Sequence, residues 1–401
     1  MNGFNAGKPA LRVEIISELS GLNALEPAWQ RLWTQDQDSD IFASLDWFLT
    51  WWEHFGHGEQ AAALVTHDGL ESIAVPGGGW QLRVCVVRDE RNEALAIVPL
   101  VLIRGVFKRL RCRILASPVN NHAPRMGLVA SRFGEDVVSA LCDALIGLEA
   151  WDVLLLDGLP SKGGRSGRLV SALAERGLVR GPHSAWPHSF FRFRGTWDEL
   201  LASKGRKFRK HVGQNQRALE KLGEVRVQRF LGDDVANRGL DLFLAIDQAS
   251  WKAREGESVG LNDALRRYYG DLCHRFAARG CAEIWVLQVG GEAAAAYLCL
   301  CGKQLRYTLK TSFRAVFGDS NRTSPSNVLL DSIIRQSWEL GTKGVDFVGK
   351  VPFVERWANE DHIYEQAVFY RNGLWALRMR TREQLERQAS RIRALVARVR
   401  G

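Results

Sequence analysis

The stretch E-I-W-V-L-Q-V-G-G-E-A-A-A-A-Y-L-C-L-C, residues 283–301, holds two apolar runs separated by Gly290 and Gly291. Aliphatic and aromatic runs joined by a Gly-Gly pair predict a β-hairpin with a tight turn. A third strand-like run follows at Leu305–Thr311, then a helical pattern from Pro325 to Leu340, then an apolar run at 344–352. This order predicts a meander joined through a crossing helix to a further strand.

The first half of the chain repeats this order without repeating the residues. A helical pattern at Glu135–Leu148 leads to W-D-V-L-L-L-D-G-L-P at 151–160, and it follows four strand-like runs: Gln81–Arg88, Ala94–Ile103, Leu110–Ala116 and Arg125–Val129. We therefore expect an α/β (α+β layered) protein with mixed central sheets, in which one unit occurs twice. The expected domains are 1–190 and 191–377, followed by a C-terminal helix at 378–401.

The composition is that of an ordinary folded protein and excludes a function based on disorder. The chain has 401 residues, 46% hydrophobic and 25% charged, enough for the cores of two domains. No apolar run reaches the ~18 residues of a membrane span, and residues 1–10 contain no apolar signal-peptide core. The seven cysteines are scattered, which favours reduced thiols. The expected location is the cytoplasm, either free or peripheral to the inner membrane.

The net charge of +9 is concentrated in two segments. Residues 192–229 carry 11 Lys/Arg against 4 Asp/Glu, and residues 378–400 carry 8 against 2. Within the first segment, the helical pattern at Ser203–Leu222 has an apolar face and a basic face. That basic face is a solvated surface, a contact for an anionic membrane or lipid carrier, or a nucleic-acid contact. The C-terminal helix is amphipathic and lies either on an anionic membrane or on its own domain.

Several familiar catalytic patterns are absent from the sequence. It contains no phosphate-binding G-x-x-x-x-G-K-[ST] loop, no H-E-x-x-H and no strand-linked G-x-G-x-x-G. His54 and His57 have helical spacing but no third ligand in sequence, so we expect no metal. Polar residues do interrupt apolar elements in the second half, at Trp251, Lys252 and Arg254, at Lys310, and at Asp346.

Short motifs around these residues resemble the CelD/BioF-like acetyltransferases. They are S-L-D-W-F-L-T-W-W-E-H-F-G at 44–56, A-I-V-P-L-V at 96–101, S-W-K-A-R-E-G at 250–256, Y-T-L-K-T-S-F at 307–313, S-P-S-N-V-L-L at 324–330 and V-D-F-V-G at 345–349. That family belongs to the GCN5-related N-acetyltransferase (GNAT) superfamily, and its two-domain arrangement is similar to the FemAB aminoacyltransferases. The sequence departs from the pattern at Ser326, where Gly is usual, and at Phe353–Arg356, where a Tyr-Lys pair is usual.

The resemblance implies tandem GNAT-like domains, with the acyl-donor site in the second. It implies transfer of an acyl group from acetyl-CoA or another acyl-CoA to an amine or hydroxyl of a small or carbohydrate-linked acceptor, in exopolysaccharide or cell-envelope metabolism. Aminoacyl-tRNA-dependent transfer is the alternative within enzymes. A non-catalytic protein that recruits an envelope assembly is the alternative outside them, and the missing Tyr-Lys pair favours it.

A helix that begins at Pro325 exposes backbone N–H groups from about Ser326 to Leu329 and has an electropositive start. With the resemblance, this start is the expected coenzyme site, formed by Ser324, Ser326, Asn327 and Val328 together with Thr311. The simpler alternative is that Ser324 only caps the helix.

Acyl transfer also requires a polarised thioester carbonyl and a base. Backbone N–H groups near Lys310–Ser312 are candidates for the first role, and Asp346 is the expected base or acceptor-orienting carboxylate, with Lys310 as the second catalytic residue. Asp346 alternatively forms a structural ion pair with Lys310 or Lys252. Trp251, Lys252 and Arg254 are the expected substrate contacts, although Trp251 is alternatively a core residue and the two cations alternatively contact coenzyme phosphates.

Overall fold

The computed structural model describes residues 11–56, 80–108, 110–125, 127–148, 151–161, 164–318, 323–382, 384, 385 and 388. The chain divides into two compact units, unit 1 (Met1–Trp186 and Tyr364–Gly401) and unit 2 (Pro187–Ile363). The sequence placed the second boundary after residue 377. In the structure, unit 2 ends at Ile363, and the chain from Tyr364 onward belongs to unit 1, because Tyr364–Tyr370 pair with Val153–Pro160. Residues 373–382 are helical, and nearly all of the remaining basic C-terminal helix lies outside the described residues.

Unit 1 contains two groups of strands, which are accompanied by several helices. Its helices are α1 (Leu19–Ala24), α2 (Glu26–Gln35), α3 (Leu45–Phe55), α4 (Glu135–Gly147) and α5 (Arg165–Glu175). Its strands are β1 (Arg12–Ile16), β2 (Gln81–Leu82), β3 (Val84–Arg88), β4 (Ala94–Val98), β5 (Val101–Phe107), β6 (Leu110–Ala116), β7 (Val129–Ala130) and β8 (Val153–Pro160). The strand orders are β1-β3-β4-β7 and β8-β6-β5-β2.

Unit 2 is built around the strand order β10-β11-β12-β13-β14-β9. Its strands are β10 (Val225–Phe230), β11 (Ala282–Val289), β12 (Glu292–Cys301), β13 (Leu305–Phe313) and β14 (Gly344–Asp346). Its helices are α6 (Trp197–Ser203), α7 (Arg206–Glu220), α8 (Leu240–Gln248), α9 (Trp251–Glu255), α10 (Asp263–Ala278), α11 (Pro325–Glu339) and α12 (Pro352–Glu355). The unit boundaries fall within β9 (Val179–Arg192) and β15 (Glu360–Tyr370).

The repeated order of elements is confirmed as a repeated topology. In unit 1, β5 and β6 are antiparallel, and α4 leads to β8, which pairs in parallel with β6. In unit 2, β12 and β13 are antiparallel, and α11 leads to β14, which pairs in parallel with β13. A parallel neighbour requires a crossover connection, and each helix supplies it.

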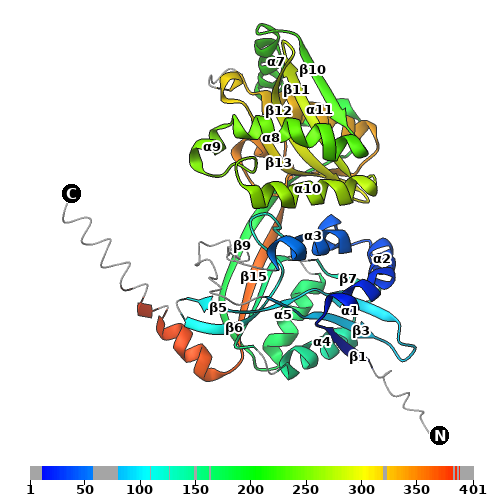
Figure 1. Cartoon of the computed structure of the whole chain (residues 1–401), viewed down its shortest axis with the longest axis vertical. Coiled ribbons are helices and arrows are strands. Elements are labelled where there is room, and N and C mark those ends of the chain that lie inside the picture. Colours follow the sequence, from blue (N-terminus) through cyan, green and yellow to red (C-terminus); the bar gives the residue numbers. More distant parts are fainter. Residues whose placement is uncertain are drawn as a thin grey trace. The chain divides into compact units, whose positions relative to one another are not determined.

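Helices cover both faces of the unit 2 sheet. Figure 1 shows α8 and α10 in front of the sheet, where α8 contacts β11–β13 and α10 contacts β11. On the other face, α11 packs on β11–β14 and α7 packs on α11. The core on that face is formed by residues such as Leu219, Tyr297, Leu329, Ile333 and Trp357. The sheet is therefore buried on both sides, which explains its nearly continuous apolar strands.

Some predicted elements differ from the observed ones for identifiable reasons. The run Ala94–Ile103 is two strands, because it breaks at Pro99, which lacks an N–H, and β4 and β5 pair in different sheets. Leu222, predicted on the apolar face of a helix, follows the end of α7 and is 57% exposed. The seven cysteines are free. No helix among the described residues is both long enough and apolar enough to span a bilayer.

Candidate active site in unit 2

Strands β13 and β14 run side by side for three residue pairs and then part. The pairs are Leu305 with Gly344, Arg306 with Val345, and Tyr307 with Asp346. Beyond them β13 continues to Phe313, whereas the chain after β14 turns to β9, where the N–H of Phe347 donates to the carbonyl of Ser189 at 3.1 Å. The far half of β13 therefore has no strand on its β14 side among the described residues.

A β-bulge lies in β13 at the point where the strands part. Lys310 pairs with Leu298 and Thr308 with Cys299, which leaves Leu309 as an extra residue. The N–H of Arg314 donates to the carbonyl of Ala294 on β12. Because N–H groups alternate in direction along an antiparallel strand, the N–H and carbonyl of Thr311 point away from β12, into the opening. Of the predicted donors around Lys310–Ser312, Thr311 is thus the one directed there.

The side chains of Lys310 and Asp346 lie on the same face of the sheet. Tyr307 pairs with Leu300 and Lys310 pairs with Leu298, two residues apart on β12, so Tyr307 and Lys310 share a face. Asp346 lies directly beside Tyr307 and takes that face too. This is the face covered by α8 and α10. The structure therefore brings the two predicted catalytic residues to one face at the strand opening.

Lys310 lies in a desolvated group with a second lysine. Its Nζ is 5.8 Å from the centre of the Tyr269 ring. Burial, reinforced by the positive charge of Lys252, lowers the pKa of Lys310 to about 8, while Asp247 acts in the opposite direction. Burial also lowers the pKa of Lys252, whose Nζ donates to the carbonyl of Thr311 at 2.5 Å. A lysine amine in such a site exchanges its proton near neutral pH.

Asp247 on α8 anchors this group, and the sequence reasoning missed it. Its buried carboxylate accepts hydrogen bonds from the hydroxyl of Ser312, from the hydroxyl of Ser258 at 2.7 Å and from the N–H of Gly260 at 3.0 Å. The available signal was a single acid on the apolar face of α8, beside Phe243 and Ile246. A buried carboxylate on such a face requires partners.

Asp346 is fully buried at the end of β14 and shapes the turn that follows. Its Oδ1 accepts the N–H of Val348 at 2.7 Å. Val348 has a φ of 54°, in the left-handed region that a β-branched residue rarely adopts. Such strain is maintained only where the surroundings enforce it, and it is common at functional sites.

The start of α11 differs in part from the expectation. The N–H groups of Asn327 and Val328 both donate to the carbonyl of Ser324, so fewer donors are available than the sequence suggested. Val328 is a core residue. The Ser324 side chain makes no capping hydrogen bond, so the simple capping alternative is wrong. Ser326 is buried, 6% exposed, and its hydroxyl has no hydrogen-bond partner among the described residues. That unsatisfied donor and the acid-free first turn fit an anion.

The three predicted substrate residues lie on α9 but point to different surroundings. Trp251 is 39% exposed, so the alternative that it is a core residue is wrong. Arg254 is also exposed, whereas Lys252 is directed to Thr311. Trp251 and Arg254 are therefore available to a ligand, and Lys252 supports β13.

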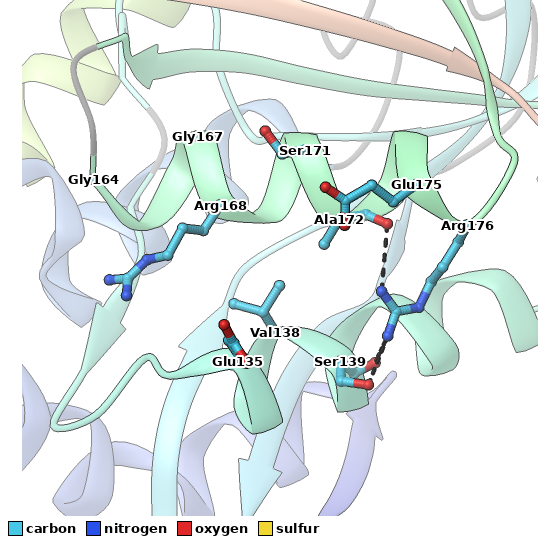
Figure 2. A pocket seen from close by; sticks show the side chains of 10 residues that line it. All are labelled: Glu135, Val138, Ser139, Gly164, Gly167, Arg168, Ser171, Ala172, Glu175 and Arg176. Atoms are coloured by element: carbon cyan, nitrogen blue, oxygen red, sulfur yellow. Dashed lines mark hydrogen bonds between the residues drawn. The ribbon is translucent and has the colours of Figure 1, made fainter.

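The corresponding helix of unit 1 is less suited to an anion. Its first turn contains Glu135 and Asp136. A pocket of about 740 Å³ lies between α4 and α5, lined by Glu135, Arg168 and Arg176 among others, and Arg176 is hydrogen-bonded to Ser139 (Figure 2). Carboxylates near a helix start oppose a second negative charge. The start of α4 is thus less suited to hold an anion than the start of α11.

Comparison with known proteins agrees with this architecture. Residues 206–362, which lie within unit 2, match the family model described as acetyltransferase (GNAT) domain. The crystal structure of FemX superposes with a TM-score of 0.58 at 13% identity and covers 91% of this chain and 99% of FemX. A tandem GNAT protein from the clavulanic acid biosynthesis pathway gives a TM-score of 0.46 at 11% identity, covering 91% and 99%. No curated protein matches the sequence. The chain therefore shares its fold with FemX, and the domain match over residues 206–362 supports an acyl-transfer role.

Proposed function

We propose that the protein transfers an acyl group from acetyl-CoA or another acyl-CoA to an amine, or a hydroxyl, of a small or carbohydrate-linked acceptor. The carrying observation is the opening between β13 and β14: the N–H of Thr311 points into it, and Lys310 and Asp346 share one face of the sheet there. The resemblance of the sequence motifs to CelD/BioF-like acetyltransferases supports a place in exopolysaccharide or cell-envelope metabolism.

Each residue group has a distinct part in the proposed reaction. The N–H of Thr311 stabilises the negative charge that develops on the thioester oxygen. The amine of Lys310 takes the proton of the acceptor nitrogen as that nitrogen bonds to the acyl carbon, and the carbon–sulfur bond breaks to release the coenzyme thiolate. Asp346 orients the acceptor. Ser326 and Asn327 at the start of α11 hold coenzyme phosphate, and Trp251 and Arg254 contact substrate.

The test combines binding and turnover. Thermal shift and calorimetry of the full chain with acetyl-CoA, longer acyl-CoAs and bulk tRNA identify the donor, because a ligand that binds only the folded state raises the melting temperature. We expect an acyl-CoA to bind and free thiol to be released when an amine acceptor is added. Absence of binding by every acyl-CoA overturns the proposal.

Aminoacyl-tRNA-dependent transfer is the second candidate, favoured by the exposed cations Arg206, Lys207, Arg209 and Lys210 in the first turns of α7. In the same experiment it predicts a shift with tRNA and none with acyl-CoA. Binding of acyl-CoA without turnover on any acceptor would instead support the non-catalytic alternative.

A further inference from the structure

A pocket of about 750 Å³ lies at the start of α7 and is separate in its residues from the acyl-transfer site. Its lining is Gly205, Lys207, Phe208, Lys210, Gln214 and Arg356. Lys207, Lys210 and Arg356 have no ion-pair or hydrogen-bond partner among the described residues. By contrast, Arg229 and Arg306 of unit 2 are both paired with the carboxylate of Glu283. Three cations without a described counterion therefore line one cavity, and none of its described lining residues is acidic.

The charge order at the start of α7 is the reverse of what stabilises a helix. Its first turn contains no acid, and Gly205 at the N-cap offers no side-chain acceptor. The N–H groups of Arg206 and Lys207 have no partner among the described residues. Cations at a helix start cost about 0.3–1 kcal/mol each at exposed positions. The preceding helix α6 shows the usual arrangement, with a Thr196 capping box and acidic residues. An anion bound at the start of α7 would be attracted both by the cations and by the helix dipole, and so would offset the repulsion between them.

Buried contacts hold Arg356 beside the start of α7. Lys204 is 8% exposed, and its ammonium donates to the carbonyls of Trp357 and Ala358, the latter at 3.0 Å. The Phe208 ring meets the Trp357 ring edge to face, with centroids 4.8 Å apart. The three cations thus come from two segments that are already packed against each other. Binding of a ligand therefore requires little loss of entropy to bring these segments together.

We propose that this pocket binds a small molecule through a diphosphate group. A diphosphate carries about three negative charges and fits three cations and two backbone N–H groups. The cavity volume is in the usual range for small-molecule sites, about 300–1,000 Å³. Phe208 is half-buried and offers an apolar wall to the group attached to the diphosphate. The proposal does not depend on acyl transfer in the neighbouring site.

Calorimetry with inorganic diphosphate and the full chain tests the charge requirement. We expect Lys207→Gln, Lys210→Gln and Arg356→Gln each to weaken binding about 3–10-fold, and the double variant Lys207→Gln/Lys210→Gln more than 10-fold. Lys221→Gln is the matched control, because Lys221 carries the same charge at the other end of α7. It should change affinity less than about 2-fold. No binding by the native chain, or an equal loss in Lys221→Gln, overturns the proposal.

Three further ligands identify the source of the diphosphate. Each experiment measures how well one compound displaces inorganic diphosphate from the pocket; the compounds are uridine diphosphate, geranyl diphosphate and coenzyme A. The compound with the highest affinity, if that affinity falls in Arg356→Gln, identifies the ligand class. A 20-nucleotide RNA tests whether the same surface binds nucleic acid instead of a small diphosphate compound. If RNA binds more tightly than all three and loses as much affinity in Lys221→Gln as in Lys207→Gln, the surface is a nucleic-acid contact and the proposal is wrong.

Discussion

The Lys252 ammonium on α9 donates to the carbonyl oxygen of Thr311 on β13 at 2.5 Å. This contact fixes α9 to the open edge of β13 and occupies the carbonyl of Thr311, while the N–H of the same residue stays directed into the opening. It also keeps a second positive charge close enough to lower the pKa of Lys310. Lys252 is therefore a positioning residue that also sets the proton affinity of its neighbour.

The pH dependence of acyl transfer should report Lys310. Its pKa is lowered to about 8, and only the neutral amine accepts a proton, so kcat/KM should rise with pH through about 8. Lys252→Met removes the neighbouring charge, which raises the pKa of Lys310 and moves this rise to higher pH. Lys310→Met should abolish the rise. A pH–rate profile that is unchanged in both variants would exclude Lys310 as the base.

Coenzyme affinity should respond to charge at the start of α11. Asn327→Asp places a carboxylate beside the proposed phosphate site and should weaken acyl-CoA binding by about 1–2 kcal/mol, measured by calorimetry. Asn262→Asp is the matched control, because Asn262 caps α10 with its side-chain oxygen and Asp serves equally well there. Equal affinities for native protein and Asn327→Asp would place the phosphate elsewhere.

Ser324 should contribute little to stability despite its position before a helix. Its side chain makes no capping hydrogen bond, so Ser324→Ala should change the free energy of unfolding by only a few tenths of a kcal/mol. Thr196→Ala removes a complete capping box at α6 and should cost about 1 kcal/mol. Urea unfolding of the two variants makes the comparison, and a similar loss in both would mean that Ser324 does cap α11.

Periodicity and turn chemistry predicted the elements of unit 2 well, because each depends on local sequence. The Gly290-Gly291 turn, the three strands beside it and the helix from Pro325 are all present where the patterns placed them. The same reasoning identified Lys310 and Asp346 as candidate catalytic residues, because a charged residue within an apolar run can be recognised from the sequence alone. The sequence could not predict towards which side of β13 each backbone N–H and carbonyl points, because this depends on the bulge at Leu309 and thus on the pairing with β12.

Contacts between distant segments were also beyond sequence reasoning. Asp247 meets Ser312 across 65 residues, and Lys204 reaches Trp357 across 153. Neither pair follows a local period, because each depends on how helices pack on the sheet. The return of Tyr364–Tyr370 to unit 1 has the same origin: a strand pairing with β8 decides it, and no change of composition marks the boundary.

Two substitutions should separate the structural role of Asp346 from its proposed catalytic role. Asp346→Asn retains an oxygen that accepts the Val348 N–H, so the fold should persist while kcat falls at least about tenfold through loss of the charge. Asp346→Ala leaves that N–H without its acceptor and should also destabilise the protein by about 1–3 kcal/mol. Val348→Gly relieves the left-handed strain and should stabilise by about 1 kcal/mol. Full activity in Asp346→Asn would exclude a role for the carboxylate charge.

Asp331 on α11 should lower stability at neutral pH. Burial raises the pKa of its carboxyl from 3.8 to about 6, partly opposed by Arg335. A raised pKa in the folded state favours the protonated form, so its contribution to stability is present below about 3.8 and is lost as the pH rises through about 6. Asp331→Asn should therefore stabilise the protein by roughly 1–2 kcal/mol at pH 7 and by almost nothing at pH 3.5. Urea unfolding at the two pH values measures this, with exposed Asp233→Asn as the control. An advantage of the same size at both pH values would show that ionisation of Asp331 is not its source.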